Sequence, residues 1–167
     1  CCAVALWNGA TMRVWSHTQG PYNLRTDLAK ALRLPPEGVI VQHVEGAGCY
    51  GHNGADDVAL DAALLARAHP GTPIRALWSR AEELAWSPLS PAMRVEVEAQ
   101  VDAAGDLLSW RIEARGNGHS SRPGRAEHPA LLAAPLLPGG APMPVAINPP
   151  LAGGGGLQRN LVPAYRI

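Results

Sequence analysis

The sequence predicts an α+β fold, in which a mixed β-sheet with two main helices is followed by a long antiparallel hairpin and an irregular Pro/Gly-rich segment. Three observations predict it. Short stretches with strand character alternate with two segments of helical periodicity in the first half of the chain. Residues 93–101 and 107–114 alternate apolar and polar side chains around a turn. From residue 116 onward, proline and glycine interrupt every periodic pattern.

The first predicted element is a hairpin, and a helix follows it. Residues 3–7 and 11–15 flank Asn8 and Gly9, a dipeptide that is typical of short hairpin turns. A loop then leads to Pro21, which can occupy the first turn of a helix because its missing N–H is not needed there. Leucines recur at helical spacing after it: Leu24, Leu28 and Leu32.

A strand, a glycine-rich loop and a second helix come next. Residues 39–44 are mostly apolar on both faces, which predicts a strand in the interior of the sheet. Residues 46–54 hold four glycines and precede a helix over residues 55–68, whose many alanines and leucines predict burial. The free N–H groups at a helix N-terminus and the helix dipole favour an anion there. A tight connection that needs positive φ angles explains the same glycines without any ligand.

The rest of the chain is predicted to form a strand over residues 74–78, a short helix over 80–84 and a hairpin with one face in water. Residues 1–115 are assigned to the α+β part of a domain, and residues 116–167 to an extended segment of the same, incomplete domain. A segment with so many turn residues needs a surface to pack on. We expect it to wrap the core or to dock on a second copy, burying four leucines: Leu131, Leu132, Leu136 and Leu137.

Composition excludes some classes of protein. The 167 residues carry a formal net charge of zero, whereas phosphate binding by a nucleic-acid protein needs a basic excess. No apolar run approaches the roughly 20 residues of a membrane helix. Three cysteines, two of them adjacent, make no disulfide framework, and this favours a reducing compartment such as the cytoplasm. The chain opens at Cys1 without a leader and ends within a pattern, so we expect an internal piece of a longer protein.

Some side chains suggest chemistry, but each has a plainer explanation. Four residues are of metal-ligand type, without the spacing of a metal site: His17, His43, His52 and Cys49. His43 lies in a strand, where a satisfied core residue is expected. Asp56 and Asp57 are expected to be helix-end or surface charges rather than an acid–base pair. Cys49 as the nucleophile of a hydrolase lacks an identifiable His/Asp partner.

Several blocks of sequence together carry a resemblance to a known family. Residues 15–21 spell Trp-Ser-His-Thr-Gln-Gly-Pro, and residues 44–57 contain the glycine-rich loop in a Cys-Tyr-Gly-His-Asn form. Further matches are found at residues 73–83, 148–150 and 159–165. The chain resembles the molybdenum-binding large subunit of the xanthine dehydrogenase/aldehyde oxidase family, and its loop is similar to that of the bacterial isoquinoline 1-oxidoreductase-like branch.

The resemblance implies a molybdenum–molybdopterin cofactor in the full-length parent. Gln19 would hydrogen-bond an oxygen on the metal, and no residue of this chain would bind the metal directly. Backbone N–H groups of the glycine-rich loop would contact the metal's apical ligand or the pterin: Gly48, Cys49, Tyr50 and Gly51. Asn53 takes the place of a substrate-contacting glutamate of the xanthine-oxidising branch, which favours an aldehyde or N-heterocycle over a purine.

The family reaction is the hydroxylation of an activated C–H carbon with an oxygen from water. The family's base, a glutamate in a Gly-Glu-Pro-Pro-like motif, is absent from this sequence. No catalytic residue is therefore assigned, and the isolated chain is expected to be inactive. The expected partners are the rest of the large subunit, an iron–sulfur subunit and a small-molecule substrate. The protein could also form a homo-oligomer, and the full-length parent could be exported from the cytoplasm. The alternative function is a stand-alone anion-binding module that uses the glycine-rich loop.

Overall fold

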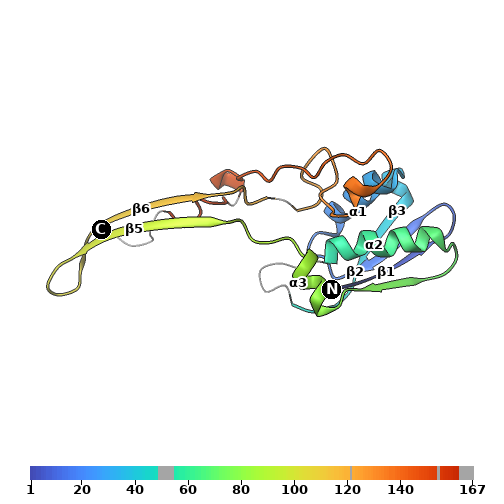
Figure 1. Ribbon diagram of the computed structural model, residues 1–167, viewed down its shortest axis with the longest axis horizontal. Helices are drawn as coiled ribbons and strands as arrows, with labels where there is room; N and C mark the ends of the chain where they lie inside the picture. Colours follow the sequence, from blue (N-terminus) through green and yellow to red (C-terminus); the bar gives the residue numbers. More distant parts are fainter. Residues whose placement is uncertain (49–54, 121, 154, 162–167) are drawn as a thin grey trace. The chain divides into compact units, whose positions relative to one another are not determined.

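The computed structural model describes residues 1–48, 55–120, 122–153 and 155–161, and the chain divides into two compact units. The first unit is Cys1–Pro88 with Arg122–Pro144, and the second is Leu89–Ser121 with Val145–Ile167. The mixed sheet and both main helices belong to the first unit, and the long hairpin belongs to the second (Figure 1). The predicted α+β class is confirmed, and the domain division at residue 115 stays a prediction.

The sheet of the first unit is mixed, with the strand order β3-β2-β1-β4. Its strands are β1 (Cys2–Trp7), β2 (Met12–Ser16), β3 (Val39–His43) and β4 (Ile74–Leu77). β1 runs antiparallel to β2 and β4, whereas β2 runs parallel to β3. The predicted hairpin turn is confirmed, because Asn8 Oδ1 accepts from the N–H groups of Ala10 (3.0 Å) and Thr11 (2.7 Å). Gly9 completes the turn with a φ of +95°, which favours glycine.

Two helices pack on one face of this sheet and enclose the core. α1 (Pro21–Leu32) contacts β3, and α2 (Ala55–Ala68) contacts β1, β2 and β4. Core residues alternate along the strands and recur at helical spacing: Ala3, Ala5, Met12 and Val14 from the sheet, Leu24, Leu28 and Leu32 from α1, and Val58, Leu60 and Ala63 from α2. Both predicted helices and the burial of α2 are thereby confirmed.

Residues 122–144 return to the first unit and attach to both helices. The Ala130 N–H donates to Asp27 Oδ2 at 2.7 Å, and the Leu132 N–H donates to Asp57 Oδ1 at 2.8 Å. Leu131, between these two anchored residues, is fully buried in the core. The expectation that this part of the chain wraps the core is therefore confirmed at Leu131.

Other predictions about burial are wrong. Leu136 is 85% exposed, and Leu132 and Leu137 are only half-buried. β3 is an edge strand rather than an interior one among the strands described, because it pairs only with β2, and its Ile40 is 38% exposed. An apolar run predicts a strand, but it carries no information about which strand ends the sheet.

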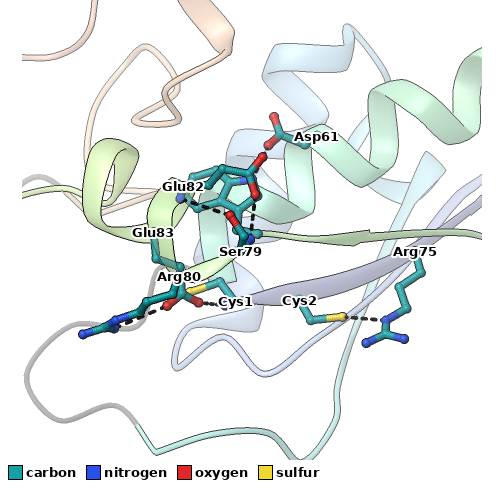
Figure 2. Close-up of polar contacts among 9 residues, drawn as sticks. Cys1, Cys2, Asp61, Arg75, Ser79, Arg80, Glu82 and Glu83 are labelled. Atoms are coloured by element: carbon teal, nitrogen blue, oxygen red, sulfur yellow. Dashed lines mark hydrogen bonds and ion pairs between the residues drawn. The ribbon is translucent and has the colours of Figure 1, made fainter.

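The short helix expected after β4 is present as α3 (Arg80–Trp86). Ser79 caps its N-terminus: Ser79 Oγ accepts from the Glu82 N–H at 3.3 Å, and Glu82 Oε2 accepts from the Ser79 N–H at 2.6 Å (Figure 2). This reciprocal capping box satisfies two otherwise free donors and lowers the pKa of the Glu82 carboxyl. Arg80 forms an ion pair with Glu83 at 3.6 Å on the same helix.

The second unit is built around the predicted hairpin of β5 (Met93–Val101) and β6 (Leu107–Gly116), which pair antiparallel. Every residue of β5 is exposed, including Val95 and Val97 at 49% each, so the expectation of a single face in water is wrong for the described residues. The alternating pattern predicts a two-faced strand, but only a partner could bury one of its faces. Among the helices within the described ranges, none combines the length and apolarity needed to cross a bilayer.

Candidate functional site

The C-terminal ends of β2 and β3 lie side by side in the first unit. Ser16 pairs with His43 in the parallel register, and the Val44 N–H donates to the Ser16 carbonyl oxygen at 3.1 Å. The loop that contains Gln19 and the glycine-rich loop therefore leave the sheet at adjacent points. Ligands of α/β proteins commonly bind outside the carboxyl ends of parallel strands, so this end of the sheet is the candidate site.

Thr18 anchors the first of these loops and is 1% exposed. Its N–H donates to Ser16 Oγ (3.2 Å), and its hydroxyl donates to Asp56 Oδ1 (2.5 Å) while accepting from the Gly20 N–H (3.2 Å). Its carbonyl oxygen accepts from His43 Nδ1 (3.0 Å). These bonds tie the loop to its own strand, to β3 and to the first turn of α2.

Gln19 is the exposed residue of this anchored loop. Its side chain makes no hydrogen bond to any other residue of the described ranges, so its amide keeps two donors and an acceptor for a ligand. Gly48 is also exposed, in the loop that follows β3. The remaining predicted site residues lie outside the described residues: Cys49, Tyr50, Gly51 and Asn53.

Gly46 allows the second loop to approach the first. A Cβ atom added to Gly46 would lie 2.5 Å from Cβ and Cγ of His17, so a larger residue requires a displacement. Burial lowers the pKa of His17, and the neighbouring His43 lowers it further. His17 is therefore neutral at pH 7, and its role at this end of the sheet is to pack against the second loop.

The two aspartates at the start of α2 are anchors that sequence reasoning missed. Asp56 and Asp57 lie in the first turn of α2, as expected for helix-end charges, but they are only 7% and 5% exposed and are therefore not surface charges. Asp56 bonds Thr18, which lies 38 positions earlier, and Asp57 bonds Leu132, which lies 75 positions later. Contacts between residues so far apart in the chain cannot be predicted from the local sequence pattern. Burial raises the pKa of Asp57 to about 6, against the lowering effect of the Leu132 N–H.

The residues of metal-ligand type are not gathered in the described part of the chain. No group of three or more His, Cys, Asp or Glu side chains within those ranges is arranged to hold a metal ion. His43 is hydrogen-bonded as expected, but it is exposed at the end of an edge strand rather than in the core. Its role in the structure is to hold the carbonyl group of Thr18.

The chain is similar to known proteins over most of its length. Residues 1–133 match the model of the molybdopterin cofactor-binding domain. A nicotinate dehydrogenase subunit of Pseudomonas putida is 39% identical over 112 residues, which are 67% of this chain and 9% of that protein. Quinoline 2-oxidoreductase of Pseudomonas putida 86 shares the fold at a TM-score of 0.55 and 24% identity, over 70% of this chain and 15% of that chain. The chain thus spans a small part of both relatives.

Proposed function

Since the chain belongs to the molybdopterin cofactor-binding domain family, we propose that the end of its sheet at Ser16 and His43 forms one wall of a molybdopterin site. The observation that carries the proposal is the anchored loop, which presents the unpaired Gln19 amide beside the glycine-rich loop. An anchored loop with a free amide suits an oxygen-rich cofactor, because the backbone is already ordered and only the Gln19 side chain must become ordered on binding.

The residues at this end of the sheet fit such a group. Gln19 would donate a hydrogen bond to a cofactor oxygen, and Gly48 with Cys49, Tyr50 and Gly51 would offer backbone N–H groups. Gly46 supports this fit, because its missing Cβ lets the glycine-rich loop lie against His17. When bound, the molybdenum cofactor supplies the oxidising centre for hydroxylation of a carbon atom. The chain's own part is to orient that cofactor and, through Asn53, to contact the substrate.

The parent protein is proposed to be a molybdenum hydroxylase that acts on an N-heterocycle or an aldehyde. Nicotinate, named in the relative that is 39% identical, is an N-heterocycle and supports the first of these substrate classes. That relative is named as a subunit, which supports a complex with other subunits. The partners that we propose for the parent are the rest of the large subunit and an iron–sulfur subunit. The isolated chain should hold negligible molybdenum and show no hydroxylase activity, because it would contribute only one wall.

The test is Gln19→Ala in the full-length parent. Loss of a hydrogen bond to a charged group costs about 1.5–3 kcal/mol, so kcat/KM should fall by about 10- to 150-fold while the protein remains folded. Gln100→Ala, an exposed amide on β5, is the matched control and should leave turnover unchanged. Molybdenum per polypeptide is measured in parallel. Wild-type turnover in a fully loaded Gln19→Ala parent contradicts the assignment, and stoichiometric molybdenum in the purified 167-residue chain contradicts the single-wall proposal.

A further inference from the structure

A second cleft of about 290 Å³ opens in the first unit between the first half of α2, α3 and residues 132–136. It shares α2 with the candidate cofactor site, but none of its lining residues is proposed to contact the cofactor or the substrate. Its lining combines three carboxylates with two tryptophans and an apolar edge, and it includes no lysine, arginine or histidine. The carboxylates belong to Asp57, Asp61 and Glu82.

Each carboxylate is held in place through one of its two oxygens. Asp57 Oδ1 accepts from the Leu132 N–H at 2.8 Å, and Asp61 Oδ2 accepts from the Trp78 indole N–H at 2.8 Å. Glu82 Oε2 accepts from the Ser79 N–H in the capping box of α3 (Figure 2). In the described ranges, the second oxygen of Asp57 and that of Asp61 make no hydrogen bond, whereas the Glu82 carboxyl has a further hydrogen bond with the Ser79 side chain.

Asp57 is the member of this set that most needs a ligand. It is only 5% exposed, yet one of its oxygens has no hydrogen-bond partner within the part of the chain that the structure describes. A carboxylate with so little exposed surface keeps only part of its hydration, and this is costly unless the charge is paired. Its neighbours Asp56 and Asp61 are also acidic and increase that cost.

The aromatic and apolar walls narrow the class of cation. Trp78 and Trp86 both line the cleft, and tryptophan is the side chain that attracts a cation to its ring face most strongly. In the described residues the carboxylates are not gathered closely enough to hold a metal ion. A guanidinium group is planar, offers five N–H donors and stacks on aromatic rings, so it can serve separated carboxylates and an indole together.

The rim of the cleft indicates which kind of molecule bears the cationic group. Trp86 and Leu136 are 63% and 85% exposed, so apolar surface surrounds the acidic floor. A polypeptide covers such a rim with neighbouring side chains, whereas a small free cation leaves it in water. We propose that this cleft binds an arginine side chain presented by a polypeptide outside this chain.

The test titrates the 167-residue chain with N-acetyl-arginine N-methylamide and follows the indole N–H signals of its five tryptophans by NMR. We expect roughly millimolar binding that shifts the signals of Trp78 and Trp86, with the other three nearly unchanged. The matched ligand is N-acetyl-citrulline N-methylamide, a neutral isostere, which should bind about tenfold more weakly. A peptide with leucines on both sides of the arginine should bind about tenfold more tightly than the single residue, because it covers the rim.

Variants of exposed side chains separate the site from nonspecific attraction. Trp86→Ala and Glu82→Gln should each weaken binding about two- to fivefold, and their combination about tenfold. Glutamine preserves the capping box, so α3 should persist in Glu82→Gln. Tyr22→Ala and Glu37→Gln are the matched controls, since both residues line a different cleft of the same unit.

Three results overturn the proposal. Equal binding of the arginine and citrulline compounds would show that the carboxylates play no part. Unchanged affinity in the combined Trp86→Ala/Glu82→Gln variant, with the indole spectrum still dispersed, would place the ligand elsewhere. Equal affinity of the leucine-flanked peptide and the single residue would contradict a polypeptide as the source of the cation.

Discussion

Replacement of the buried Asp57 by asparagine should make the first unit more stable at neutral pH than the unaltered chain. Asp57 is 5% exposed, and burial raises the pKa of its carboxyl from 3.8 to about 6. Asparagine has nearly the same shape, and its carbonyl oxygen can still accept from the Leu132 N–H. The substitution therefore removes the buried charge and keeps the hydrogen bond that anchors residues 122–144.

The size of the effect follows from the pKa shift. One pKa unit corresponds to about 1.4 kcal/mol, so a rise from 3.8 to about 6 corresponds to about 3 kcal/mol. Below pH 3.8 the carboxyl is protonated in both the folded and the unfolded chain, and no penalty exists. Between pH 3.8 and about 6 the folded chain binds the extra proton, so stability is lost as the pH rises. Above about pH 6 the full penalty of about 3 kcal/mol is present.

The assay is urea unfolding at several pH values between about 4 and 8, followed by far-UV circular dichroism. The free energy of unfolding of Asp57→Asn minus that of the unaltered chain should rise by about 2.5 kcal/mol across this window, because groups common to both chains cancel and about 0.5 kcal/mol of the penalty is already present at pH 4. Asp106→Asn, on the exposed hairpin turn, controls for the loss of one negative charge. A difference that stays constant within about 0.5 kcal/mol over the whole window would refute the reasoning.

Four further substitutions probe the site and the core. Thr18→Val keeps the shape of the side chain but leaves the buried hydrogen-bond partners of the hydroxyl unsatisfied. It should lower the free energy of unfolding by about 1–3 kcal/mol in urea titrations. An unchanged free energy of unfolding would mean that the loop is not held by this hydroxyl. Gly46→Val places side-chain atoms where His17 lies, so the full-length parent should retain less molybdenum per polypeptide, and full loading would argue against close packing of the two loops. Leu131→Ala should destabilise the chain by about 2–5 kcal/mol, whereas Leu136→Ala should change stability by less than about 0.5 kcal/mol; equal effects would contradict the burial of the first and the exposure of the second.

The elements of this fold could be predicted from the sequence because their signals are local. The turn at Asn8, the first-turn proline of α1 and the periodicity of α2 each lie within one element, and all three are present in the structure. Burial could not be predicted as well, because it depends on what lies opposite. Val95 and Ile40 have the pattern of buried strand residues, yet both are exposed in the described residues.

The candidate site was predictable only in part. The resemblance singled out Gln19, which proves to be exposed and without a hydrogen bond among the described residues, although its contact with a cofactor stays a prediction. What holds Gln19 in place had no sequence signal. Thr18 is anchored by an aspartate 38 residues away, and pairing at that distance becomes visible only once the strands and α2 are assembled.

The first turn of α2 serves two different surfaces because consecutive helical residues point about 100° apart. Asp56 faces the loop that carries Gln19, while Asp57 faces residues 130–132 and the tryptophan-lined cleft. The helix therefore needs two neighbouring buried carboxylates, although each raises the cost of ionising the other. A cation in the cleft would offset that cost at Asp57, whereas Asp56 already accepts a hydrogen bond from the Thr18 hydroxyl. The position of α2 thus links an acidic cleft on one side to the loop of the proposed cofactor site on the other.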